Sequence, residues 1–171
     1  MSKSLVTEPA DMLCHKAEKD ILNVKVLSDK NFYPEDLMYD IICFHTTQAV
    51  EKFLKSYIIN NGKTVEKIHD LDILHKAAME IDTSFTNIRK DCVLLNVFVP
   101  DMKYSEQESI TKQNIIDIIK SLDVICNFPP IKTMRDSFSK KRKYEIVDEV
   151  ITAPTKPAAV RNGKKKNGSL R

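Results

Sequence analysis

Four polar residues that could bind an anion fall within two turns of one predicted helix. Gln48, Glu51, Lys52 and Lys55 are separated mostly by three or four positions, and residues at those separations are neighbours on a helix surface. One interpretation is a polar patch that grips a nucleotide, RNA or the acidic surface of a partner. The alternative is structural: Glu51 and Lys55 form an ordinary helix ion pair, and Gln48 satisfies a backbone group.

His69 and the neighbouring pair Lys103 and Tyr104 are further candidates for ligand contact. His69 precedes a predicted helix, where it can either cap or pack beneath the connector, or contact a phosphate or transfer a proton. Lys103 and Tyr104 lie in a loop before another predicted helix, whose free backbone N–H groups favour an anion. They either anchor that loop or contact the ligand. The predicted ligand-binding residues are therefore Gln48, Lys52, Lys55, His69, Lys103 and Tyr104.

Other kinds of site are not indicated by the sequence. The four cysteines lie far apart, with no Cys-x-x-Cys pair, so we expect reduced, buried thiols and no metal site. No arrangement of Ser, His and Asp forms a nucleophile motif, and we expect no cofactor. No apolar run approaches the roughly 18 residues of a membrane span, and no signal peptide is apparent. We therefore expect a cytoplasmic protein with no membrane contact.

Composition favours an all-α protein with an unequal distribution of charge. Among 171 residues there are three Gly and no Trp, which leaves little material for hairpins or Gly-rich phosphate loops. Residues 139–171 hold ten basic and three acidic residues, a net charge of +7, whereas the preceding residues hold 17 and 21, a net charge of −4. We expect a helical domain over residues 1–130 and a basic, largely disordered tail over residues 131–171.

The basic tail admits three interpretations. It can be a solvated extension, an arm that attracts RNA or DNA through phosphate neutralisation, or a segment that docks on a partner. The apolar pattern of residues 144–151 could form a short helix or strand within it.

Apolar residues spaced by three and four predict about five helices. The first begins after a cap at Thr7 and ends at Leu27. The second runs from Pro34 to Asn61, and its apolar residues occupy several sides, so it should form the centre of the core.

Shorter helices are predicted over residues 71–81 and 85–95, the second capped by one of residues 82–84. The last begins at a capping box formed by Ser105 and Glu108 and ends before Pro129 and Pro130. Short connections favour an antiparallel up-and-down bundle with four main helices and one short extra helix.

Three stretches of the chain resemble the HEPN family of small helical domains. Residues 17–21 match the family's first-helix pattern of Ala, two variable residues, Asp and an aliphatic residue. Residues 44–55, FHTTQAVEKFLK, are similar to the signature F-x-x-Q-Q-A-x-E-K-x-x-K, and residues 69–74 resemble H-D-L-x-x-L. The order and spacing of the three stretches also match, over roughly residues 10–127.

The resemblance implies an antiparallel helical bundle that forms a homodimer. Many members are encoded beside a minimal nucleotidyltransferase, and some of these pairs are a toxin and its antitoxin. Many catalytically active members are metal-independent ribonucleases. Their Arg and His, separated by about four to six residues, act as acid and base groups on a ribose 2′-hydroxyl and its phosphate.

This sequence departs from the ribonuclease pattern. No His follows an Arg at the required distance, and Lys103-Tyr104-Ser105 stands where the family branch reads R-Y-P. Thr47 replaces the first Gln of the Q-Q pair. We therefore expect a non-catalytic module that binds a nucleotide-like ligand or a nucleotidyltransferase partner. The alternatives are a divergent ribonuclease using Lys103, Tyr104 and His69, and an RNA- or DNA-binding accessory protein acting through its basic tail.

Overall fold

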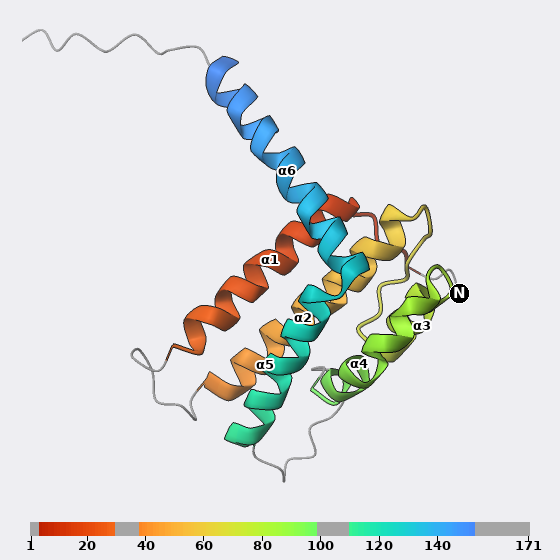
Figure 1. Cartoon of the computed structure of the whole chain (residues 1–171), viewed down its shortest axis with the longest axis vertical. Helices are drawn as coiled ribbons and strands as arrows, with labels where there is room; N and C mark the ends of the chain where they lie inside the picture. The colour runs from red at the N-terminus through yellow and green to blue at the C-terminus, as the bar shows by residue number, and fades with distance from the viewer. Residues whose placement is uncertain (1–3, 30–37, 99–109, 153–171) are drawn as a thin grey trace, which may run out of the picture.

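Helices form every regular element in the part of the chain that the structure describes (Figure 1). The computed structural model describes residues 4–29, 38–98 and 110–152. The elements are α1 (Ala10–Leu27), α2 (Tyr39–Asn60), α3 (Leu71–Met79), the 3₁₀ helix η2 (Thr83–Ile88), α4 (Arg89–Asn96), α5 (Lys112–Asn127) and α6 (Pro129–Thr152). The prediction of an all-α protein is confirmed. Within these described ranges, none of the helices combines the length and the apolar character needed to cross a membrane.

Helix α2 lies at the centre of the fold. It contacts α1, α3, α4, α5 and α6, and in Figure 1 it runs between α1 on one side and the pair α3 and α4 on the other. Phe53, Leu54 and Ile58 of α2 are almost completely buried. The prediction that this helix forms the centre of the core is confirmed.

The cysteine thiols are part of this core. Cys14, Cys43, Cys92 and Cys126 are all buried, and none of these four is in a disulfide. Burial raises the pKa of Cys14 and of Cys92 to about 12, so both thiols are protonated at neutral pH. As predicted, they act as small apolar side chains.

Two helices begin differently from the sequence-based prediction. Pro9, not Thr7, occupies the N-cap position of α1, and it makes no side-chain cap hydrogen bond. Helix α5 begins at Lys112, after a capping box in which Thr111 and Asn114 each bond the other's backbone N–H. The predicted capping box at residues 105–108 lies outside the described residues, and α5 starts later than we expected. The sequence also predicted that one of residues 82–84 caps the helical segment over residues 85–95. This prediction is confirmed, because Asp82 is the N-cap of η2 and its carboxylate accepts a hydrogen bond from the Ser84 backbone N–H.

The chain remains part of the helical body beyond residue 130. Helix α6 begins at Pro129, and its residues Ile131 and Met134 are buried in the core. Proline ends the preceding helix but is compatible with the first turn of a new one, where its missing N–H is not needed. The predicted start of a basic tail at residue 131 is therefore wrong. The end of the predicted tail, residues 153–171, lies outside the described residues.

Arg135 fastens α6 to the rest of the bundle. Its Nε and Nη2 atoms donate to the two carboxylate oxygens of Glu18 in α1, at 2.6 and 3.1 Å. Its Nη1 atom donates to the carbonyl oxygen of Cys126, in the last turn of α5, at 2.9 Å. The guanidinium also lies 5.0 Å from the ring centroid of Phe53, within the range of a cation–π contact. One side chain thus joins α6 to three other helices.

The burial of Ile131 predicts the stability of a variant. We expect Ile131→Ala to lower the free energy of unfolding by about 2 to 5 kcal/mol, because truncation leaves a cavity in a close-packed core. Ile73 is 51% exposed on α3, so the matched control Ile73→Ala should cost less than about 1 kcal/mol. Urea denaturation measures both values, and equally small effects would show that α6 is not packed on the body.

Candidate anion-binding site

The N-terminal segment holds the connector between α2 and α3 in place. The backbone N–H of Val6 donates to the carbonyl oxygen of Val65 at 2.8 Å, and that of Lys67 donates to the carbonyl oxygen of Ser4 at 2.9 Å. Leu5 and Glu66 form an isolated antiparallel bridge. These contacts fix the connector that carries Lys67 and His69.

Asp20 links α1 to two side chains of α2. This carboxylate is largely buried, with 12% of its side chain exposed, and it lies 2.5 Å from the Lys52 ammonium and 2.9 Å from Nδ1 of His45. Because an ionised carboxylate can only accept hydrogen bonds, Nδ1 of His45 carries the proton in this contact. His45 is therefore a partnered, half-buried residue whose contact joins α1 to α2.

Glu51 accepts three hydrogen bonds from side chains. Its Oε1 atom accepts from the Lys55 ammonium at 2.7 Å. Its Oε2 atom accepts from Nδ1 of His69 at 2.9 Å and from the amide nitrogen of Gln48 at 3.2 Å. The amide oxygen of Gln48 in turn accepts from Lys52 at 3.2 Å. The carboxylates of Glu51 and Asp20 therefore belong to one continuous polar network.

Burial makes this network sensitive to the loss of any one member. The side chains of Glu51 and Lys55 are each only 6% exposed, and a buried charge is strongly unfavourable unless it is paired. The imidazole of His69 is 49% exposed, so the network runs from the interior to the surface. Because His69 and Lys55 both donate to Glu51, a change in the contacts of His69 can alter the hydrogen bonds of the buried pair Glu51 and Lys55.

A cavity of about 290 Å³ opens beside the exposed end of the network. Two glutamates, Glu8 and Glu51, line it together with His69, the small apolar residues Val6 and Leu13, and Thr7. It is also lined by four lysines: Lys16, Lys52, Lys55 and Lys67. Four lysines against two glutamates give the lining a formal charge of +2, so the cavity favours an anion.

Three of the four lysines that line the cavity already form an ion pair with a carboxylate. Lys55 pairs with Glu51, Lys52 pairs with Asp20, and Lys16 forms an exposed pair with Glu8 at 2.6 Å. Lys67 is exposed, and it forms no ion pair with another residue that the structure describes. An arriving anion would therefore meet Lys67 first.

The structure brings together four of the six predicted site residues. Gln48, Lys52, Lys55 and His69 belong to the network described above, whereas residues 103 and 104 (Lys103 and Tyr104) lie outside the described residues. The predicted ion pair between Glu51 and Lys55 is confirmed.

Two details of the structural interpretation are wrong. Gln48 bonds side chains of Glu51 and Lys52 and not a backbone group. The residue that caps α3 is Asp70, whose carboxylate accepts from the backbone N–H groups of Asp72 and Ile73, so His69 is left to contact Glu51.

Sequence reasoning missed Asp20, Lys16 and Lys67 as members of the site. Asp20 did carry a signal, because it is the acidic position of the first-helix pattern noted above, and a charged residue on the inward side of a helix needs a partner. Lys16 and Lys67 carried none, since exposed lysines are common throughout the chain and only the fold brings these two to one cavity.

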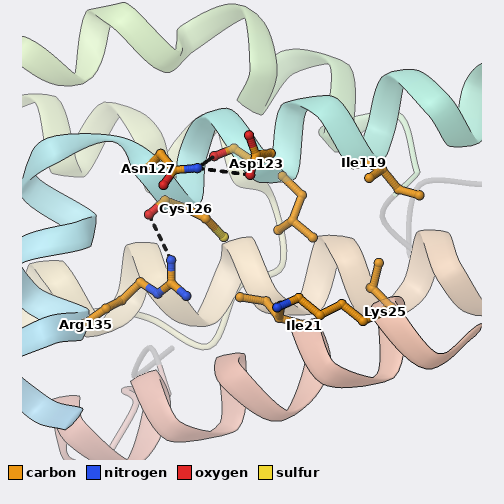
Figure 2. Close-up of a pocket in the computed structure, with 9 residues that line it drawn as sticks. Ile21, Lys25, Ile119, Asp123, Cys126, Asn127 and Arg135 are labelled. Atoms are coloured by element: carbon orange, nitrogen blue, oxygen red, sulfur yellow. Dashed lines mark hydrogen bonds between the residues drawn. The ribbon is translucent and has the colours of Figure 1, made fainter. Parts of the chain in front are cut away.

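A second cavity, of about 270 Å³, lies between α1, α5 and α6 (Figure 2). Its floor is apolar and includes Ile21 and Ile119. Asn127 donates to the carbonyl oxygen and the carboxylate of Asp123, at 3.0 Å each, and Arg135 is held by Glu18 and Cys126. Because most of its polar groups already bond one another, this cavity is less suited to a charged ligand than the first.

No group of three or more His, Cys, Asp or Glu residues in the described ranges is placed to hold a metal ion. The arrangement at the first cavity is instead one of ammonium groups and an imidazole. Such groups bind anions and do not require a cation to do so.

Comparison with known proteins identifies one relationship. The model of the HEPN domain family matches residues 10–132, a range that holds α1 to α5 and the start of α6 and makes up well over half of the chain. No curated protein and no solved structure matches the chain.

The buried network predicts that two similar lysines differ in their effect on stability. Lys55 and Lys76 each pair with a carboxylate four residues earlier, but the Lys55 side chain is 6% exposed and the Lys76 side chain 62% exposed. Lys55→Ala leaves Glu51 buried without its ammonium partner and should cost about 3 to 5 kcal/mol. Lys76→Ala should cost less than about 1 kcal/mol. Chemical denaturation compares the two, and equal costs would contradict the buried network.

Proposed function

The chain belongs to the HEPN domain family, and from that premise we propose that it binds a phosphate-bearing, nucleotide-like ligand in the first cavity. The observation that supports the proposal is the convergence of four lysines and His69 on one cavity of about 290 Å³. A cavity of this volume lies near the lower end of the range for small-molecule sites, so it suits a mononucleotide better than a dinucleotide.

The donors around the cavity match the needs of a phosphate group. Each lysine ammonium has three N–H donors, and Lys55 uses one of them on Glu51. Lys67 adds a positive charge that forms no ion pair with a described carboxylate. Lys16 can leave its weak, exposed ion pair with Glu8 and donate to a phosphate oxygen instead. Val6 and Leu13 line the same cavity and provide apolar contact for a sugar or base.

We propose a binding role and not catalysis by the ribonuclease mechanism known in the family. The chain has no His at the required distance after an Arg. The described network uses Nδ1 of His69 to contact Glu51, and His69 lines the first cavity, where we propose that the phosphate binds. The competing proposal, a divergent ribonuclease using His69, Lys103 and Tyr104, requires cleavage of RNA that is lost in His69→Ala.

The family also suggests partners, and we propose a homodimer that works beside a minimal nucleotidyltransferase, as in toxin–antitoxin pairs. Ile41 and Phe44 support a protein contact on α2. They lie one turn apart and are 41% and 44% exposed, and exposed apolar residues grouped on one surface are typical of interaction sites.

Nucleotide binding and its dependence on Lys67 test the proposal. We expect adenosine monophosphate, measured by isothermal titration calorimetry, to bind the wild type and to bind Lys67→Glu about tenfold more weakly, equivalent to about 1.4 kcal/mol. Lys67 is exposed, so this substitution should leave the fold intact.

The matched control is Lys25→Glu, which makes the same charge change on α1 at a residue that lines the second cavity instead. It should bind the nucleotide within about twofold of the wild type. Absence of binding to the wild type, or an equal loss in the two variants, would contradict the proposed function.

A further inference from the structure

The second cavity, between α1, α5 and α6, has a floor of aliphatic side chains. Ile21 and Val24 line it from α1, and Ile119 and Leu122 line it from α5. Ile119 is half-buried, and the other three are buried. Binding sites for small molecules are mostly apolar, with a few polar groups that fix the orientation of the ligand. The lining of this cavity has that composition.

Two side chains of opposite charge lie beside the aliphatic floor. Figure 2 shows Lys25 on the α1 side of the cavity and Asp123 on the α5 side. Both residues are exposed, and neither forms an ion pair with the other or with a further residue that the structure describes. The Asp123 carboxylate accepts at Oδ1 from the side-chain amide of Asn127 at 3.0 Å, and its Oδ2 atom remains open to a donor. Lys25 keeps all three of its N–H donors.

The two charges act on the same part of the cavity, the Cys126 thiol. Cys126 lines the cavity and is 9% exposed. Burial is the main cause that raises the pKa of this thiol to about 11; among the charges nearby, the Asp123 carboxylate raises this pKa and the Lys25 ammonium lowers it. An ammonium and a carboxylate that both act on one buried sulfur lie around the same part of the cavity.

The charges at this cavity cancel. Arg135 donates two hydrogen bonds to Glu18, and Lys25 and Asp123 supply one further charge of each sign. The cavity therefore has no net charge once Glu18 is counted, whereas the lining of the first cavity has a formal charge of +2. An anion or a cation leaves either Asp123 or Lys25 without a partner. A ligand that carries one charge of each sign provides a partner for both.

We propose that this cavity binds a free α-amino acid with an aliphatic side chain. The carboxylate of the ligand accepts from Lys25, its ammonium donates to Asp123, and its side chain lies on the aliphatic floor. An α-amino acid carries both charges on one carbon atom, so it can join two groups that form no ion pair with each other. The volume of about 270 Å³ lies just below the range of about 300 to 1,000 Å³ for sites of drug-sized ligands, which suits so small a molecule. No residue of the first cavity is involved, so the proposal goes beyond nucleotide binding and is independent of it.

Methyl NMR with L-leucine tests this proposal on the wild-type chain. We expect L-leucine, added up to about 10 mM so that millimolar affinities are detected, to shift the methyl resonances of Ile21 and Ile119 in a saturable way. The methyl resonances of Ile73, which lines a different cavity, should stay unchanged.

Three analogues of leucine separate the contributions of its parts. Leucinamide lacks the carboxylate, isocaproate lacks the ammonium, and glycine lacks the aliphatic side chain. Each should bind at least about tenfold more weakly than leucine, because each loses either a charge-assisted hydrogen bond or the burial of an aliphatic group.

The variant Lys25→Gln/Asp123→Asn removes both charges from exposed residues, and it should weaken leucine binding at least about tenfold. The matched control is Lys120→Gln/Asp117→Asn, which makes the same changes on α5 at a pair 3.9 Å apart that does not line the cavity. This control and Lys67→Glu should both bind leucine within about twofold of the wild type. The proposal is overturned if leucine produces no saturable shift, if leucinamide or isocaproate binds as tightly as leucine, or if the two double variants lose binding equally.

Discussion

A buried carboxylate constrains the half of the structure that contains the candidate site. Glu51 is placed in the middle of the central helix with 6% of its side chain exposed, and at that depth its charge is tolerated only when donors surround it. Lys55 and Gln48 supply two donors from the same helix, and His69 supplies the third from the connector after α2. The backbone pairing between residues 4–6 and the connector holds that third donor in place. The hydrogen-bonding needs of the Glu51 carboxylate therefore explain why α2, the connector after it and the N-terminal segment meet at the first cavity.

Local features of this arrangement could be predicted from the sequence, and contacts between distant segments could not. The pairing of Glu51 with Lys55 follows from their spacing on one helix. Asp20 is 32 residues from Lys52, and only the packing of α1 on α2 brings them together. Lys67 illustrates the same limit, because its part in the cavity depends on the connector's pairing with the N-terminal segment.

The starts of α5 and α6 also show what a local signal can and cannot decide. Thr111 with Asn114 forms the capping box of α5, and a pair of this kind is a local signal comparable to the one predicted at residues 105–108, so the sequence alone does not place the start of this helix. Pro129 and Pro130 correctly indicate the end of α5, yet a proline is equally acceptable in the first turn of the next helix. The burial of Ile131 and Met134 decides that a helix follows. This places the first residues of the predicted tail on the body of the protein, where Arg135 donates two hydrogen bonds to Glu18.

The central claim, that the buried network presents His69 and its neighbouring lysines to a phosphate, is tested most directly by the imidazole ¹⁵N resonances. Because Glu51 accepts from Nδ1 of His69, the account predicts that His69 carries its proton on Nδ1 in the free protein and that its ¹⁵N resonances shift when adenosine monophosphate is added. His75 is buried, with Nε2 lying 2.8 Å from the carbonyl oxygen of Phe85, and its resonances should stay unchanged as an internal reference. Nucleotide binding that leaves the His69 resonances where they were would contradict the account.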